Sequence, residues 1–113
     1  AWRRCLSLTS FPLIDTSLGT DFLATWLDCT SLIHFPLLDM SAGTDFSLAW
    51  NSCALDSASI DNIMQSLVNN GSSSLVTSVA SGTSLGFSSW SAGAIANYNI
   101  LVGTRGWTIA TNA

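Results

Sequence analysis

The chain contains no lysine and no glutamate, and its only charged residues are three arginines and seven aspartates. Charged residues make up 9% of its 113 positions, and the formal net charge is −4. Nucleic-acid binding is disfavoured, because it needs clustered Lys and Arg to displace counterions from phosphates. Anionic membrane surfaces are disfavoured for the same reason. We therefore expect neutral side chains, mainly Ser, Thr and Asn, to provide solubility.

Long apolar runs are also missing. Hydrophobic residues make up 48% of the chain and the mean hydropathy is +0.42. No run, however, approaches the roughly 18–20 apolar residues that a membrane-spanning helix needs. We expect no membrane insertion and a core assembled from apolar residues spread along the whole chain.

What the sequence does contain is an internal repeat. Residues 8–31 read LTSFPLIDTSLGTDFLATWLDCTS and residues 32–55 read LIHFPLLDMSAGTDFSLAWNSCAL. Twelve of the 24 aligned positions are identical. They are Leu8/Leu32, Phe11/Phe35, Pro12/Pro36, Leu13/Leu37, Asp15/Asp39, Ser17/Ser41, Gly19/Gly43, Thr20/Thr44, Asp21/Asp45, Phe22/Phe46, Trp26/Trp50 and Cys29/Cys53. A fixed period of roughly 20–30 residues is typical of a stacked solenoid, in which each unit buries its apolar face against the next.

The chain begins inside a copy of this repeat, because Trp2 and Cys5 fall one period before Trp26 and Cys29. No signal peptide is visible and the first residue is not Met. We expect the natural N-terminus, with any targeting signal, to lie upstream.

Each copy predicts one coil of an α/β solenoid. Residues 8–13 and 32–37 alternate as short parallel strands, with the two prolines pointing outward because proline cannot donate within a central ladder. The Gly-Thr-Asp segments that start at Gly19 and Gly43 predict short helices, with Thr as the N-cap. These helices would point Phe22, Trp26 and Cys29 into the core.

After Cys53 the period breaks. The sequence predicts a helix from Ser57 to the Asn69-Asn70-Gly71 stop signal, a strand over residues 75–79, a helix over about 89–102 and a strand over 107–111. We expect one solenoid domain over residues 1–113, with regular repeats in 1–55 and a C-terminal helix–strand cap in 56–113. No comparable cap precedes residue 8, which leaves the first strand as an open edge.

The repeated residues resemble a known family. The pattern C-x-S-L-x-x-F-P-L-[IL]-D-x-S-x-G-T-D-F-x-x-[AT]-W-x-x-C is similar to BspA-like leucine-rich repeats over residues 1–55. The C-terminal half, with IDNIMQSL and RGWTI, looks like the terminal segment of such arrays in marine microbial and phage sequences. The resemblance implies a short right-handed leucine-rich-repeat solenoid, with parallel strands on the concave face and short helices on the convex face. It also implies an extracellular, cell-surface or virion-associated setting.

Three columns of repeated residues have alternative interpretations. Cys5, Cys29 and Cys53 predict a column of buried thiols, with a disulfide between neighbours or a zinc site as less favoured alternatives. Asp15 and Asp39 predict turn-capping carboxylates, with calcium binding as the alternative. The column of Trp2, Trp26 and Trp50, like that of Phe22 and Phe46, predicts core packing, with an exposed ladder for sugar rings as the alternative.

No catalytic constellation, cofactor site or metal site is expected. The single histidine, His34, would lie on the exposed strand face beside Ser10, with no acid expected within hydrogen-bond reach to orient it. We expect a non-enzymatic recognition or adhesion module that binds a protein or glycan on this face. The predicted binding residues are Thr9, Ser10, Pro12, Ile33, His34 and Pro36. The alternative is a structural spacer or self-assembly module, a homo-oligomer joined through the open N-terminal edge from Ala1 to Leu13.

Overall fold

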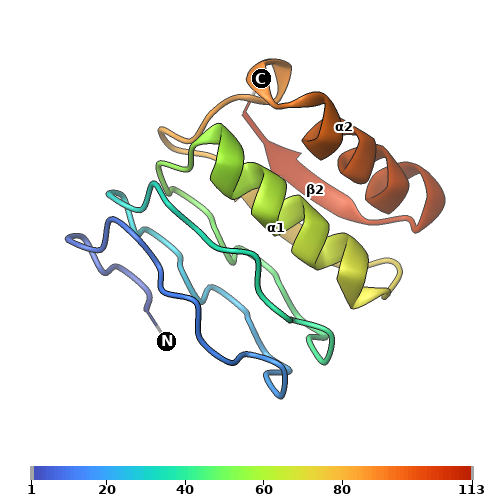
Figure 1. Cartoon of the computed structure of the whole chain (residues 1–113), viewed down its shortest axis with the longest axis horizontal. Coiled ribbons are helices and arrows are strands. Elements are labelled where there is room, and N and C mark those ends of the chain that lie inside the picture. The colour runs from blue at the N-terminus through green and yellow to red at the C-terminus, as the bar shows by residue number, and fades with distance from the viewer. Residues whose placement is uncertain (1, 113) are drawn as a thin grey trace.

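A computed structural model describes residues 2–112, apart from the side chain of Ala80. Its regular elements all lie in the second half of the chain (Figure 1). They are α1 (Ser57–Asn70), β1 (Val76–Ala80), the 3-10 helix η1 (Phe87–Ser89), α2 (Ala92–Asn99), the π-helix η2 (Ile100–Thr104) and β2 (Thr108–Thr111). Strands β1 and β2 form a two-stranded parallel sheet.

The two copies of the repeat lie side by side and in register. Ser10 bridges His34 in parallel, and Asp21 bridges Asp45 in the same way. Further along, the Trp26 amide donates to the Ala49 carbonyl over 2.8 Å. Each of these contacts joins equivalent or near-equivalent positions, so the 24-residue period of the sequence is also the period of the backbone pairing.

Stacked aromatic rings fill the space between the copies. Trp2 stacks on Trp26 and Trp26 on Trp50, with ring centroids 6.1 and 5.3 Å apart. Phe22 stacks on Phe46 with centroids 5.2 Å apart and an interplanar angle of 1°. The predicted aromatic columns are therefore confirmed. Trp26, Trp50 and Phe46 are fully buried, which makes this column the centre of the core.

The predicted fold class, a leucine-rich-repeat solenoid with regular strands and convex helices, is wrong. The fold is a small α/β arrangement with two α-helices and a two-stranded parallel sheet, and residues 2–55 contain neither a helix nor a regular strand. Residues 8–13 and 32–37 share only the bridge between Ser10 and His34. Proline in both segments explains part of this, because it offers no N–H for a ladder.

The expected helices after Gly19 and Gly43 are replaced by tight turns. Ala24 and Asp28 have φ values of 52° and 60°, and the equivalent Leu48 and Ser52 have values of 57° and 59°. A left-handed backbone conformation interrupts a right-handed helix. Phe, Trp and Cys at this spacing therefore lie on consecutive turns instead of on a helix, and their side chains still point into the core.

Predictions for the second half agree better with the structure. Helix α1 begins after Asp56, whose carboxylate accepts from the Ser59 amide, and it ends at Gly71 with a left-handed φ of 81°. Strands β1 and β2 match the two predicted strands within one residue at each end. The second predicted helix is divided into η1, α2 and η2, because Trp90 and Ser91 are extended and Ser91 caps α2 instead.

Two rows of segments run through the molecule (Figure 1). In one row, the turns of the second repeat pair with β1 through the bridge between Phe46 and Thr77, and β1 pairs with β2. In the other row, α1 lies against the extended residues 33–43, and α2 packs against α1. The N-terminal end of α1 consequently stands beside His34.

A polar stripe on α1 satisfies the backbone of residues 33–43. Ser59 Oγ accepts from the Phe35 amide and donates to the Ile33 carbonyl, both over 2.8 Å. Ser66 Oγ accepts from the Leu38 amide over 3.1 Å. Asn62 donates to the Phe35 carbonyl, and Asn70 donates to the carbonyls of Met40 and Gly43. Side chains of a helix here do what a neighbouring strand does in a sheet.

Replacing Ser66 with Ala tests this stripe. Ser66 is fully buried, so S66A leaves the Leu38 amide without its acceptor, and we expect a loss of about 1–3 kcal/mol in the free energy of unfolding. Urea denaturation measures the loss. The control N69A changes an exposed residue of the same helix and should cost less than about 0.5 kcal/mol. Equal values for the two variants would contradict the role of the stripe.

Candidate functional site

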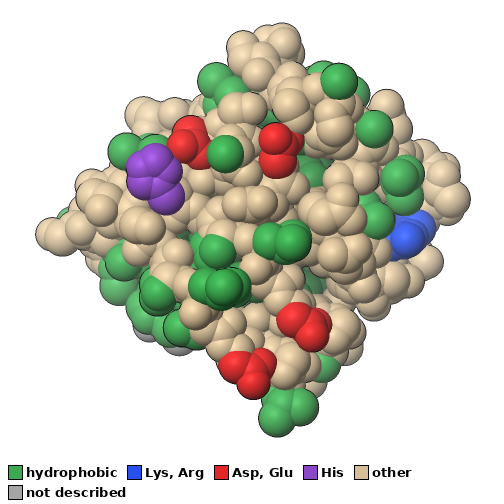
Figure 2. Space-filling view, in the orientation of Figure 1, with side chains coloured by type: hydrophobic (Ala, Val, Ile, Leu, Met, Phe, Trp, Pro, Cys, Tyr) green, Lys and Arg blue, Asp and Glu red, His purple; other side chains and the backbone are tan. Residues whose placement is uncertain are grey.

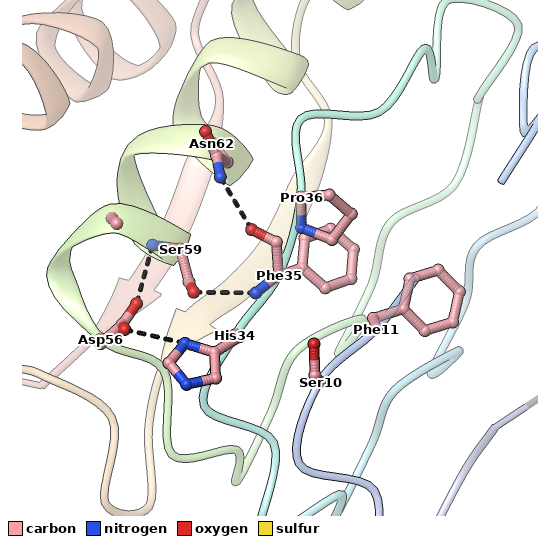
Figure 3. Close-up of a pocket in the computed structure, with 9 residues that line it drawn as sticks. Ser10, Phe11, His34, Phe35, Pro36, Asp56, Ser59 and Asn62 are labelled. Atoms are coloured by element: carbon pink, nitrogen blue, oxygen red, sulfur yellow. Dashed lines mark hydrogen bonds and ion pairs between the residues drawn. The ribbon is translucent and has the colours of Figure 1, made fainter. Parts of the chain in front are cut away.

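A cleft of about 240 Å³ opens between the exposed Ser10–His34 pair and the N-terminal turn of α1. Figure 3 shows Ser10 and His34 on neighbouring segments, with Asp56, Ser59 and Asn62 on the helix side. We name this feature the His34 cleft. Its lining residues are Ser10, Phe11, His34, Phe35, Pro36, Asp56, Ala58, Ser59 and Asn62.

Alternation along the repeated segments places polar groups at the cleft and rings beneath it. Phe11 and Phe35 are each 3% exposed and stack on one another with centroids 5.4 Å apart. The residues just before them, Ser10 and His34, point the other way and are exposed. The two equivalent segments of the repeat thus provide both the apolar floor of the cleft and its polar rim.

His34 and Asp56 form an ion pair across the mouth of the cleft. His34 Nδ1 lies 3.1 Å from Asp56 Oδ2, and the two side chains are 63% and 39% exposed. Asp56 has a second role, because its Oδ1 accepts from the Ser59 amide at the start of α1. One carboxylate therefore fixes both the helix terminus and the imidazole.

The environment of Asp56 keeps its carboxylate ionised. Partial burial opposes the charged form, but hydrogen bonds from Ser59 and the nearby His34 outweigh it and lower the pKa of Asp56 below its ordinary value of 3.8. The cleft therefore presents a fixed negative charge at its helix side.

Two polar groups of the cleft remain available to a ligand. In the described part of the chain, neither the Ser10 hydroxyl nor His34 Nε2 takes part in a hydrogen bond. The side chains of Ser59 and Asn62, by contrast, already form hydrogen bonds with the backbone of residues 33–35. The rim thus offers a hydroxyl, an imidazole nitrogen and the remaining lone pairs of Asp56.

Ser10, His34 and Asp56 are the residue types of a hydrolytic triad, but their arrangement differs from one. A triad needs a hydrogen bond between nucleophile and base, and a base held in a water-excluded site. No hydrogen bond joins the Ser10 hydroxyl to the His34 imidazole within residues 2–112, and the imidazole is mostly exposed. The geometry supports hydrogen bonding to a ligand better than it supports covalent chemistry.

Three of the six predicted binding residues lie together in the lining of the His34 cleft. Thr9, Ser10, Pro12, Ile33 and His34 are exposed, and Pro36 is partly buried. Of these six, Ser10, His34 and Pro36 line the His34 cleft, whereas Thr9, Pro12 and Ile33 lie outside its lining. The three outer residues extend the surface around the cleft on the repeat side.

Sequence reasoning missed the half of the cleft that α1 contributes. Asp56, Ser59 and Asn62 come from a segment that was predicted only as part of a C-terminal cap. A signal for them was present, because Ser59, Asn62, Ser66 and Asn70 recur every three to four residues and so share one face of a helix. Such a polar row beside the apolar stripe indicates a helix that satisfies another segment's backbone.

The cysteine column consists of free thiols. Cys29 and Cys53 are fully buried, Cys5 is partly exposed, and none is in a disulfide. Cys53 Sγ donates to the Trp26 carbonyl, and burial together with the neighbouring Cys29 raises the pKa of Cys53 to about 12. The Cys53 thiol therefore stays protonated at neutral pH. No cluster of three or more His, Cys, Asp or Glu side chains suited to a metal ion occurs among residues 2–112.

Asp15 and Asp39 cap turns, as predicted. Asp15 Oδ1 accepts from the amide and hydroxyl of Ser17, and Asp39 Oδ1 accepts from the Ser41 amide. Hydrogen bonds from the hydroxyl and the amide of Ser17 lower the pKa of Asp15, and those from the hydroxyl and the amide of Ser41 lower the pKa of Asp39.

The Trp column is not an exposed platform for sugar rings. Trp26 and Trp50 are fully buried, and their indole N–H groups have no hydrogen-bond partner among the described residues. Ring packing holds the column. The interpretation of this column as a glycan-binding ladder is therefore wrong.

No helix within residues 2–112 is both long enough and apolar enough to cross a membrane.

No protein-family model, curated protein or solved structure matches the chain. The resemblance to BspA-like repeats accordingly stays a prediction that rests on the quoted residues.

The ion pair predicts a pH-dependent contribution to stability. Because folding lowers the pKa of Asp56 below 3.8, its contribution is present above that pH and is lost as the pH falls through the folded-state pKa. We expect D56N, which keeps a capping side chain, to lose less than about 1 kcal/mol at neutral pH. The difference between wild type and D56N should shrink towards pH 3 in urea titrations. A difference that stays constant with pH would contradict this contribution.

Proposed function

We propose that the protein is a non-enzymatic recognition module that binds its ligand at the His34 cleft. The observation that carries this proposal is the pair of uncommitted polar groups, the Ser10 hydroxyl and His34 Nε2, at a cleft whose lining includes Phe11 and Phe35. An ionised Asp56 completes the rim as an acceptor. Convergent polar groups over an apolar surface are typical of small-ligand sites.

Of the two ligand classes expected from the sequence, a glycan fits the cleft better. At about 240 Å³ the cleft is smaller than the roughly 300–1,000 Å³ of sites for drug-sized ligands, so it suits a single ring. Sugar hydroxyls both donate and accept, which matches a rim that holds a carboxylate, a hydroxyl and an imidazole. The apolar face of a sugar ring can rest on Pro36, which is partly exposed in the lining of the cleft.

The surrounding surface supports adhesion that is insensitive to salt. Figure 2 shows little positive charge on the face that carries the histidine, and most of that face is uncharged. Binding through neutral hydrogen bonds releases few counterions, so affinity should change little with ionic strength. An extracellular, cell-surface or virion-associated setting is part of this proposal and rests on the resemblance to BspA-like repeats.

Titration of ¹⁵N-labelled protein with glucose, galactose and N-acetylglucosamine tests the proposal. We expect amide shifts to concentrate on Ser10, His34 and the first turn of α1. The double variant S10A/H34A should raise the Kd at least tenfold, equivalent to about 1.4 kcal/mol, because both free rim groups are lost. Its thermal midpoint should stay near that of wild type, since exposed ion pairs contribute only about 0–1 kcal/mol.

The control variant is T30A, which removes a hydroxyl from an exposed residue outside the cleft. It should bind as wild type does. The glycan proposal fails if none of the three sugars shifts these amides up to about 10 mM, a tenfold excess over a Kd of about 1 mM. Shifts centred on another surface would contradict the choice of the cleft.

A further inference from the structure

Two further hollows adjoin the His34 cleft along α1. The middle hollow has a volume of about 230 Å³, lies between α1 and α2, and shares Asn62 with the His34 cleft. The end hollow has a volume of about 410 Å³, lies beside residues 37–41 near the C-terminal end of α1, and shares Leu37 with the middle hollow. The His34 cleft and these two hollows therefore follow one another as a row.

One face of α1 borders the whole row. Asn62, Gln65 and Asn69 stand at i, i+3 and i+7 of the helix, so their side chains share a face. Gln65 lines the middle hollow and Asn69 lines the end hollow. The helix residues that line the row run from Ala58 to Asn69, which corresponds to about 17 Å of helix. A ligand that occupies the whole row is therefore a chain of rings and not a single ring.

Hydrogen bonds join the amide side chains of this surface in one direction. Asn97 of α2 donates to Gln65 Oε1 over 3.2 Å, and Gln65 Nε2 donates to Asn69 Oδ1 over 2.9 Å. Within residues 2–112, the side-chain oxygen of Asn97 and the side-chain nitrogen of Asn69 form no hydrogen bond. The amides therefore offer a free acceptor beside the middle hollow and a free donor beside the end hollow.

An exposed leucine stands between the middle hollow and the end hollow. Leu37 lines both of them and is 47% exposed. Its side chain gives the C–H face of a sugar ring an apolar surface, while the neighbouring amides are within the same two linings to contact hydroxyl groups. Pro36 provides a similar apolar surface in the His34 cleft.

The row carries acidic side chains and no arginine. Asp56 lines the His34 cleft, Asp61 lines the middle hollow and Asp39 lines the end hollow. No arginine of residues 2–112 lines any of the three. Figure 2 shows acidic side chains at several places on the face that carries the histidine. Carboxylates in each hollow repel an anionic ligand, so the row favours an uncharged chain.

The backbone beside the row is not free to pair with a peptide. The amides of Phe35 and Leu38 already donate to the hydroxyls of Ser59 and Ser66. The Phe35 carbonyl accepts from Asn62. An extended peptide binds by adding a strand to unpaired backbone groups. A glycan, which binds through side-chain hydrogen bonds, therefore fits the row better than a peptide does.

We propose that the row is one binding site for an uncharged β-1,4-linked oligosaccharide of at least three rings. This inference rests on the proposed function, because the first ring occupies the His34 cleft. The second ring lies in the middle hollow, where its hydroxyls meet Asn97 and Gln65. The third ring lies beyond Leu37, where Asn69 donates to it. A β-1,4-linked chain is extended and follows a straight helix, whereas an α-1,4-linked chain curls away from one.

The dependence of affinity on chain length tests this inference. The titrants for ¹⁵N-labelled protein are β-1,4-linked oligomers of glucose and of N-acetylglucosamine with one to four units. In at least one series, the Kd should fall at least about tenfold from one unit to three, because two further hollows are filled. A fourth unit should change the Kd less than about threefold, since the row then has no further hollow. The trimer should shift the amides of Gln65 and Asn69 together with those of Ser10 and His34.

The variant Q65A/N69A removes the amides of the second and third hollows. It should bind the single sugar as wild type does and raise the Kd of the trimer at least about tenfold. Both side chains are exposed, so its thermal midpoint should stay near that of wild type. The matched control N99A removes an exposed amide of α2 that lies outside all three hollows, and it should bind the trimer as wild type does. The β-1,4-linked trimer of glucuronic acid should bind at least about tenfold more weakly than the neutral trimer.

Single sugars that bind at the His34 cleft, with trimers that bind no more tightly, overturn the inference and leave the proposed function standing. So does a trimer whose affinity falls equally in Q65A/N69A and N99A. An acidic trimer that binds as tightly as the neutral one overturns the choice of an uncharged chain. A trimer that shifts Gln65 and Asn69 without Ser10 and His34 overturns the cleft as the first position of the row. Absence of binding by every oligomer, single sugars included, overturns both proposals.

Discussion

The need to satisfy the backbone of the extended segments governs this structure. Residues 33–43 belong to no sheet although Phe35, Leu38 and Met40 are buried in the core, and an unpaired buried amide costs about 1–3 kcal/mol. Helix α1 meets that need with Ser59, Asn62, Ser66 and Asn70. Because these side chains fix the position of the helix, they also place Asp56 beside His34. The His34 cleft therefore forms where α1 packs against the second copy of the repeat.

The first copy lacks this kind of cover on its outer side. The second copy has α1 and β1 on one side and the first copy on the other, whereas residues 9–22 have a neighbour on one side only. Within residues 2–112 the second copy is therefore covered on both sides, and residues 9–22 on one side. Ligand binding is proposed where the two copies meet α1, at the His34 cleft.

Much of the packing could be predicted from the sequence, because identical residues one period apart must meet when copies align. The stacking of Trp26 on Trp50 and the burial of Cys53 follow from this alone. The turn conformation could not be predicted, since positive φ at Ala24 and Leu48 falls on residues that ordinarily favour helices. For the site, Ser10 and His34 followed from alternation, but Asp56 reaches His34 only through the tertiary placement of α1.

Native-state hydrogen exchange at two amides tests the central role of α1 most directly. Phe35 and Leu38 lie outside any helix or strand, yet their amides donate to Ser59 and Ser66. We predict that both exchange as slowly as the amides of α1 and far more slowly than the amide of Ile14, which donates to no acceptor within residues 2–112. Exchange of Phe35 and Leu38 at the rate of Ile14 would contradict the account, because the helix would then not be holding the repeat.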